Sequence, residues 1–338
     1  MSQPLTLREP MVVIGAGSWG TALAIQLARE GHPTCLWGRD AADLESMRVQ
    51  RRNRRYLPGA AFPESLRVEP DLKRALEGVR DVLIAVPSHA FRETLETVRP
   101  LLTAAARVAW ATKGMEMQSG LLPHQVALEV LGDRPTAVLS GPTFAVEVGA
   151  GLPTAMTVAS RDAQFGAELA RNLSGPKFRA YLQADIIGVE IGGAVKNVIA
   201  IGSGISDGLG FGANTRVALI TRGLAEMMRL GVRLGAARDT FMGLAGLGDL
   251  VLTCTDDQSR NRRFGIALGR GASSADAARA IAQVIEGVPA ARAVREVATR
   301  LGVEMPICEQ VYQIVHRGGE VRAAVDTLMR RALRAEGD

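Results

Sequence analysis

Residues 11–20 read Met-Val-Val-Ile-Gly-Ala-Gly-Ser-Trp-Gly, an apolar run that passes directly into the spaced glycines Gly15, Gly17 and Gly20. In this spacing the first glycine permits a tight turn, the second lets the backbone approach a pyrophosphate, and the third lets the helix pack closely on the strand. N–H groups at the start of the following helix face the anion. Because an apolar strand precedes the glycines and a helical pattern follows over 18–30, the motif favours a dinucleotide-binding turn over a merely structural one.

Further strand-like runs alternate with helical segments through the first half of the chain. They are Thr34–Trp37, Asp81–Val86, Arg107–Trp110 and Thr136–Leu139. Such alternation predicts a parallel sheet, because parallel strands need crossover connections. After Ile187 strand-like runs disappear and helical periodicity dominates, for example over 217–230, 277–285 and 290–301. The predicted fold class is α/β, an N-terminal Rossmann-type doubly wound sheet (residues 1–188) followed by an all-α C-terminal domain (residues 189–338).

The composition fits a globular protein of two domains. The chain has 338 residues and a net charge of +5, from 40 Lys and Arg against 35 Asp and Glu. The basic residues are scattered, which argues against nucleic-acid binding, and the one dense cluster, Arg51–Arg55, is typical of a solvated face. Cys35, Cys254 and Cys308 are widely spaced and odd in number, so we expect neither a disulfide framework nor a cysteine metal pair, and we expect no metal site.

Two segments bear on the cellular location. Met1–Pro10 lacks the apolar core of a secretion signal. Ile186–Ile205 is long and largely apolar, but Glu190, Lys196 and many glycines within it favour a close-packed buried helix over a membrane span. The sequence therefore predicts a cytoplasmic protein without membrane insertion.

The end of the second strand bears on the choice of cofactor. An acidic residue for the adenosine ribose is usual at this place, but Arg39 occupies it here. A guanidinium could pair with a 2′-phosphate, which favours NADP(H), while the next residue, Asp40, leaves NAD(H) possible. The alternative is an ordinary surface arginine.

Polar groups follow two later strands. Lys113 comes just after Arg107–Trp110, so its amine should reach the carboxyl edge of the sheet, where such folds bind ligands. Within Ser140–Ala145, Gly141 permits close backbone approach and Thr143 supplies a hydroxyl. The alternatives are a surface lysine and a structural turn.

Lys196 lies among apolar and glycine residues, where a lysine is hard to explain as a solubility feature. A buried amine beside another cation has a lowered pKa, which suits proton exchange with an alcohol or carbonyl oxygen. Its neighbour Asn197 could fix substrate hydroxyls. The alternative is a lysine whose stem is buried at a domain boundary while its amine reaches water.

Two further segments complete the candidates. Asp249 lies in apolar surroundings, where it could orient a lysine, bind a substrate hydroxyl or simply cap a helix. If Ser259 starts a helix, the free N–H groups and Arg260 form a site for phosphate or carboxylate, with Asn261 beside them. An exposed basic helix start is the alternative reading of this triplet.

Six motifs, in this order along the chain, are similar to those of one protein family. They are Gly-Ala-Gly-Ser-Trp-Gly (15–20), Ala-Thr-Lys-Gly (111–114), Ser-Gly-Pro-Thr-Phe-Ala (140–145), Lys-Asn-Val-Ile-Ala (196–200), Gly-Leu-Gly-Asp-Leu (246–250) and Ser-Arg-Asn (259–261). Over nearly its whole length the chain resembles the bacterial-type NAD(P)-dependent sn-glycerol-3-phosphate dehydrogenases. The resemblance implies reversible NAD(P)H-dependent reduction of dihydroxyacetone phosphate to sn-glycerol 3-phosphate, which supplies glycerophospholipid biosynthesis.

The resemblance also implies roles for particular residues. Lys196 is similar to the family's proton donor in reduction and acceptor in oxidation. The implied substrate contacts are Lys113, Gly141, Thr143, Lys196, Asp249, Ser259, Arg260 and Asn261. The implied cofactor contacts are Gly15, Gly17, Ser18, Trp19, Gly20, Arg39, Lys113, Ala145, Arg260, Val284 and Glu286. Only the resemblance points to Val284 and Glu286.

Other functions remain open on the residues alone. The substrate of a two-domain dehydrogenase could be a 3-hydroxy acid, a hydroxyacyl thioester or a nucleotide sugar. A non-catalytic NADP(H) sensor would share the glycine turn, but the buried Lys196 and the Ser259–Asn261 triplet argue against it. We expect a homodimer formed through the helical domain.

Overall fold

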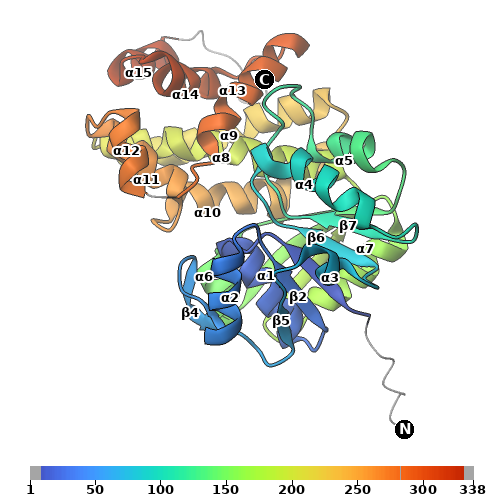
Figure 1. Ribbon diagram of the computed structural model, residues 1–338. Helices are drawn as coiled ribbons and strands as arrows, with labels where there is room; N and C mark the ends of the chain where they lie inside the picture. Colours follow the sequence, from blue (N-terminus) through green and yellow to red (C-terminus); the bar gives the residue numbers. More distant parts are fainter. Residues whose placement is uncertain (1–8, 282, 331–338) are drawn as a thin grey trace. The chain divides into compact units, whose positions relative to one another are not determined.

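The computed structural model describes residues 9–281 and 283–330 and divides into two compact units (Figure 1). Unit 1 comprises the chain up to Lys113 together with Leu121–Glu190. Unit 2 comprises Gly114–Gly120 and the chain from Ile191 onward. Most of the N-terminal segment Met1–Pro10 lies outside the described residues.

The core of unit 1 is an eight-stranded sheet. Its strands are β1 (Met11–Ile14), β2 (Thr34–Trp37), β5 (Leu66–Val68), β6 (Asp81–Ile84), β7 (Arg107–Trp110), β8 (Thr136–Ser140), β9 (Thr154–Ser160) and β10 (Phe178–Gln183). The spatial order is β10-β9-β8-β7-β6-β1-β2-β5, and a separate hairpin pairs β3 (Arg52–Asn53) with β4 (Leu57–Ala61). In this spatial order, the run β8-β7-β6-β1-β2-β5 is parallel throughout. Strands β1, β6 and β7 are buried along their whole length, as expected of a sheet covered on both faces.

This sheet confirms the predicted doubly wound fold and adds to it. The switch point lies at β1, whose neighbours β2 and β6 continue the order in opposite directions. The sequence did not anticipate β9 and β10, which pair with one another in parallel but meet β8 in antiparallel register. The sheet is therefore mixed at this edge.

Helices and short helical turns connect the strands of unit 1. They are α1 (Ser18–Arg29), α2 (Ala41–Gln50), α3 (Leu72–Leu76), η1 (Ser88–Ala90), α4 (Phe91–Val98), η2 (Arg99–Leu101), α5 (Pro123–Leu131), α6 (Ala145–Ala150) and α7 (Ala163–Leu173). Helix α1 is buried from Gly20 to Ala28 and contacts α6 and α7. Its Leu23 and Leu27 share one apolar cluster with Leu36 of β2 and Phe165 of α7, so this core fixes the helix that follows the glycine turn.

Helix α8 (Ile186–Gly208) begins in unit 1 and continues into unit 2. Its first turns are held by the buried Glu190, whose Oε1 accepts hydrogen bonds from Trp110 Nε1 (3.0 Å) and His124 N (2.9 Å), while Oε2 lies 2.6 Å from His124 Nδ1. Burial raises the pKa of the Glu190 carboxyl, and the His124 and Trp110 hydrogen bonds oppose the rise. The helix is long and apolar enough to cross a membrane, but its apolar window is 89% buried, which identifies a core helix.

Unit 2 contains helices but no strands among its described residues. Besides most of α8 it contains α9 (Ala213–Arg233), η3 (Arg238–Met242), η4 (Leu244–Gly248), α10 (Asp249–Thr255), α11 (Arg260–Gly269), α12 (Ser274–Ile281), α13 (Gly287–Leu301), α14 (Pro306–Arg317) and α15 (Val321–Met329). The predicted helix over 277–285 is too long, because α12 ends at Ile281 and α13 starts at Gly287. Pro289 has no N–H to donate and is tolerated in a first helical turn, which agrees with the start of α13 two residues before it, at Gly287.

Candidate functional site

The glycine turn between β1 and α1 has the geometry that a dinucleotide requires. Gly15 has φ +119°, and a Cβ on it would lie 2.6 Å from the Ala85 carbonyl oxygen. A Cβ on Gly20 would lie 1.9 Å from the Gly15 carbonyl oxygen, whereas nothing lies within 4 Å of a Cβ placed on Gly17. The first and third glycines are therefore needed for packing, and Gly17 leaves open space over the turn.

The residues after the turn also fit a bound nucleotide. Ser18 is the first residue of α1, where N–H groups lack partners within the helix. The indole Nε1 of Trp19 is buried and has no hydrogen-bond partner among the described residues. An unpaired buried donor beside an anion-binding turn is explained by a ligand acceptor, so the residues present fit NAD(P)(H).

Asn53 holds the glycine turn by hydrogen bonds, a role that was not predicted from the sequence. This residue is fully buried, and its Nδ2 donates to the Ala16 carbonyl oxygen (2.9 Å) and to Thr21 Oγ1 (2.8 Å). It lies inside the Arg51–Arg55 cluster, which had been interpreted as a solvated face. Arg51 departs from that interpretation too, because it donates to the Leu66 carbonyl oxygen at 2.7 Å. The signal in the sequence was an uncharged amide inside a basic run.

At the end of β2 the two candidates for the ribose differ in their contacts. Arg39 is exposed. Asp40 Oδ1 accepts hydrogen bonds from Ala42 N and Asp43 N, both at 3.0 Å, and so caps α2. The carboxylate is thus already engaged by the helix start, while the guanidinium extends into solvent.

Three predicted residues of unit 1 meet at the carboxyl edge of the sheet. Lys113 Nζ donates to the Gly141 carbonyl oxygen at 3.3 Å, and Thr143 Oγ1 donates to the same oxygen at 3.2 Å. Gly141 has φ +146°, a conformation that side chains rarely adopt. Ser140 Oγ beside them is buried without a partner among the described residues, and Ala145 begins α6.

In unit 2 the predicted lysine is buried in a polar pair. Lys196 Nζ donates to Asp249 Oδ1 and, at 3.0 Å, to Thr253 Oγ1, and their side chains are 8% and 1% exposed for Lys196 and Asp249. The charged group that contacts the amine within unit 2 is the Asp249 carboxylate, and a neighbouring cation stays a prediction. Asp249 contacts the lysine amine, and its role in orienting the lysine stays a prediction, while Gly248 and not Asp249 occupies the N-cap position of α10.

The Ser259–Asn261 triplet starts α11, as predicted. Ser259 is the N-cap residue, and its Oγ accepts a hydrogen bond from Arg262 N at 3.2 Å. Arg260 is half-buried, and Asn261 Nδ2 donates to Asn197 Oδ1 at 2.8 Å. Asn197 therefore connects the helix that carries Lys196 with this helix start.

The same network reaches the residues that only the resemblance suggested. Asn261 Oδ1 accepts from Gly287 N at 2.9 Å, and Asn197 Nδ2 lies 3.5 Å from Glu286 Oε2. Val284 is exposed between α12 and α13. Glu286 thus belongs to the network of Asn197 and Asn261, and Val284 lies two residues away from it in the chain.

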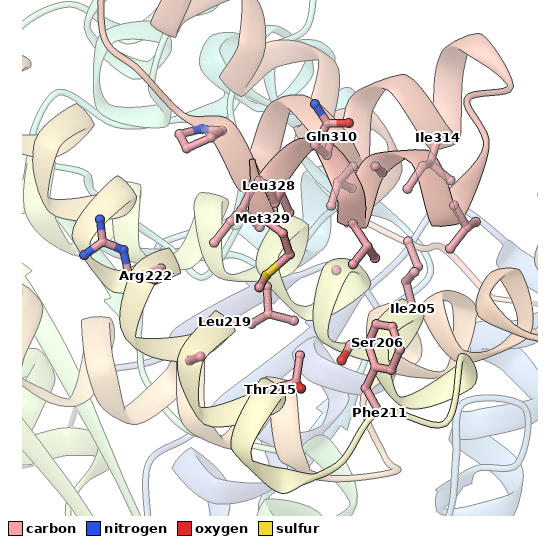
Figure 2. Close-up of a pocket in the computed structure, with 18 of the residues that line it drawn as sticks. Ile205, Ser206, Phe211, Thr215, Leu219, Arg222, Gln310, Ile314, Leu328 and Met329 are labelled. Carbon is pink, nitrogen blue, oxygen red and sulfur yellow. The ribbon is translucent and has the colours of Figure 1, made fainter. Parts of the chain in front are cut away.

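A cavity of about 440 Å³ elsewhere in unit 2 has different chemistry (Figure 2). Its walls come mainly from α9, α14 and α15 and are largely apolar, with Leu219, Ile314 and Leu328 among the lining side chains. None of the predicted site residues lines it. We therefore place the candidate site at the polar groups described above.

An anion-binding glycine turn in one unit and a buried lysine held by a carboxylate in the other define the class of protein, an NAD(P)-dependent oxidoreductase. The sequence models for the N-terminal and C-terminal parts of NAD-dependent glycerol-3-phosphate dehydrogenase match residues 10–166 and 185–326. The chain belongs to this family.

Individual relatives agree. A glycerol-3-phosphate dehydrogenase of Edwardsiella ictaluri, named as using NAD(P)+, is 58% identical over 328 residues, covering 96% of this chain and 97% of the relative. The crystal structure of glycerol-3-phosphate dehydrogenase from Coxiella burnetii matches with a TM-score of 0.93 and 49% identity, covering 96% of this chain and all of that one. The yeast enzyme GPD1 matches with a TM-score of 0.83 and 26% identity, covering 95% of this chain and 99% of that chain.

The predicted activity, fold class and cofactor are thus confirmed. The chain is an NAD(P)-dependent glycerol-3-phosphate dehydrogenase by family, and the reaction is the reversible reduction of dihydroxyacetone phosphate to sn-glycerol 3-phosphate. This reaction supplies the glycerol phosphate of glycerophospholipids.

Proposed function

We propose that residues 1–188 bind the cofactor and residues 189–338 carry the proton-transfer and phosphate groups. The observation that carries this proposal is the buried Lys196, whose amine is held by Asp249 and Thr253. A buried ammonium with fixed partners can donate a proton to a substrate oxygen without reorganisation of solvent.

Lys196 is the proposed catalytic residue. During reduction its ammonium stabilises the developing alkoxide and then protonates it, and during oxidation the amine accepts the proton. Asp249 and Thr253 orient the amine toward the substrate oxygen in this proposal. The bound cofactor supplies the hydride for the carbonyl carbon.

The start of α11 holds the substrate phosphate in this proposal. The Ser259-capped helix start offers N–H groups and Arg260 offers a guanidinium, a combination that suits a doubly charged anion. Lys113, Gly141, Thr143 and Asn261 contribute the remaining substrate contacts. The phosphate is thereby held away from the reacting carbon, which orients the carbonyl group.

The cofactor assignment rests on the glycine turn and the end of β2. Gly15, Gly17 and Gly20 shape the pyrophosphate site, and the exposed Arg39 favours the 2′-phosphate of NADP(H). Further cofactor contacts are proposed for Ser18, Trp19, Lys113, Ala145, Arg260, Val284 and Glu286.

The proposal extends to the state of the protein in the cell. We propose a cytoplasmic homodimer that associates through the helical unit. The buried position of α8 agrees with an enzyme that acts on small, water-soluble metabolites. Sedimentation of the purified chain would give its oligomeric state directly.

The decisive experiment follows the absorbance of NADPH and NADH on addition of dihydroxyacetone phosphate, with acetoacetate and an acyl thioester as competing substrates. We expect decay with dihydroxyacetone phosphate alone. Lys196→Ala should abolish turnover and retain cofactor binding, measured by quenching of tryptophan fluorescence. No decay with folded, cofactor-bound protein, or near-normal turnover in the variant, contradicts the proposal.

A further inference from the structure

Three arginines lie in the first turn of α11, and their surroundings differ. Arg260 is half-buried and forms no ion pair within the described parts of the chain, and Arg263 is exposed. Arg262 is only 7% exposed and contacts two carboxylates, those of Asp207 and Asp257. The three guanidinium groups therefore cannot have the same function.

The contacts of Arg262 neutralise its charge inside the protein. Its Nε and Nη2 donate to Asp207 Oδ2 at 3.1 and 2.7 Å, and its Nη1 donates to Asp257. Asp207 lies near the end of α8, and its other oxygen accepts two hydrogen bonds from Arg216 of α9, at 3.0 and 2.8 Å. A guanidinium saturated by carboxylates has little attraction left for a substrate anion, which leaves that function to Arg260.

Helices α8 and α11 contact each other backbone to backbone. A Cβ on Gly204 would lie 2.1 Å from the Arg262 carbonyl oxygen, and a Cβ on Gly208 would lie 2.4 Å from the Ile266 carbonyl oxygen. On α11, a Cβ on Gly265 would lie 2.1 Å from the Ile201 carbonyl oxygen. Glycine surfaces allow this close approach but have no side chains that interlock and fix the rotation of one helix on the other.

We propose that Arg262 is a positioning residue of the phosphate site, because its pairing with Asp207 fixes the rotation of the first turn of α11 relative to the helix that carries Lys196. The Ser259-capped N–H groups and the Arg260 side chain then converge on one anion position. This inference rests on the proposed binding of the substrate phosphate at the start of α11. It assigns separate tasks to neighbouring arginines, anion binding to Arg260 and helix orientation to Arg262.

The test compares Arg262→Lys with the wild-type enzyme on two substrates. Lysine keeps the positive charge but cannot form the planar, forked contact with Asp207. We expect the KM for dihydroxyacetone phosphate to rise about tenfold and the inhibition constant of inorganic phosphate to rise in parallel, with kcat nearly unchanged. With unphosphorylated dihydroxyacetone, kcat/KM should be the same in both proteins, because no phosphate is positioned.

Matched variants separate orientation from charge and from stability. Arg263→Ala removes an exposed arginine from the same turn and should leave the KM unchanged. Arg216→Gln removes the other guanidinium from Asp207 without touching α11 and should change the KM by less than about threefold. Should Arg262→Lys fail to fold, Asp207→Asn gives the same comparison, with the same rise in KM expected.

Two results overturn the inference, and they differ from failure of the proposed function. An unchanged KM in Arg262→Lys, while Arg260→Ala raises it, shows that the phosphate site needs no orientation by Arg262. An equal loss of activity on the phosphorylated and unphosphorylated substrates shows a general structural effect. If Arg260→Ala leaves the KM unchanged, the proposed phosphate site itself is wrong.

Discussion

Lys196 Nζ donates a hydrogen bond to Thr253 Oγ1 at 3.0 Å, and this hydroxyl donates in turn to the Asp249 carbonyl oxygen at 2.6 Å. The hydroxyl thus accepts from the amine and is itself fixed by the backbone of α10. We expect Thr253→Val, which has nearly the same shape, to lower kcat for dihydroxyacetone phosphate reduction about tenfold, because the amine loses one of its orienting acceptors. Steady-state rates at saturating NADPH measure this effect.

Thr253→Ser is the control for this prediction, because it keeps the hydroxyl and removes only a methyl group. It should retain most of the wild-type kcat, and both variants should bind NADPH normally. Wild-type turnover in Thr253→Val would show that the lysine needs no orientation by Thr253.

Thr253 was not predicted as a site residue from the sequence, although its partners Lys196 and Asp249 were. The motifs identified Lys196 and Asp249 because each is a charge in apolar surroundings, which carries a free-energy cost that needs an explanation. A threonine within a helix carries no such cost. Its spacing of four residues from Asp249 was the available signal, since residues at i and i+4 share a helix face.

The fold was predictable to the extent that local patterns determine it. Apolar runs and the glycine turn located β1, β2, β6, β7 and β8, and their alternation with helices predicted the parallel order. The direction of β9 was not predictable, because an apolar strand has the same side-chain pattern in either orientation. Strand β10 lies at the sheet edge, where Tyr181 and Leu182 are exposed and the apolar signal is weak.

Asn53 provides a second prediction, on cofactor affinity. Its side chain bonds the Ala16 carbonyl oxygen in the turn and Thr21 Oγ1 in α1. Asn53→Ala should raise the Kd of NADPH about tenfold. Loss of these buried hydrogen bonds costs roughly 1–3 kcal/mol and leaves the turn free to depart from its binding conformation. Fluorescence titration measures the Kd, and Arg54→Ala, an exposed neighbour, is the matched control. Equal affinities in the two variants would refute the role of Asn53.

Arg39 provides a third prediction, on the choice between cofactors. Its exposed guanidinium stands where a 2′-phosphate is expected, while Asp40 is engaged in capping α2. Arg39→Ala should lower kcat/KM for NADPH about tenfold or more and change that for NADH by less than about threefold. Arg48→Ala, which removes an exposed arginine from α2, should change neither value. A parallel loss with both cofactors would count against pairing of Arg39 with the 2′-phosphate.

Glu226 on α9 provides the last prediction, on the pH dependence of stability. The carboxylate is buried and accepts hydrogen bonds from Ile307 N (2.6 Å) and Cys308 N (3.1 Å) at the start of α14. Burial raises the pKa of Glu226 from 4.5 to about 7, although these two hydrogen bonds and the charge of Arg229 oppose the rise. The folded protein therefore binds this proton more tightly than the unfolded chain does.

The sign of the effect follows from this difference in proton binding. As the pH rises from about 4.5 to about 7, the unfolded chain gives up the proton first, so the Glu226 contribution to the free energy of unfolding falls. In Glu226→Gln the amide does not titrate, so this slope is absent. Thermal unfolding of both proteins at about pH 5 and about pH 8 should therefore show a Tm difference, wild type minus variant, that is larger at the lower pH. Parallel Tm profiles would show that Glu226 keeps an ordinary pKa, with its two backbone hydrogen bonds fully offsetting the burial.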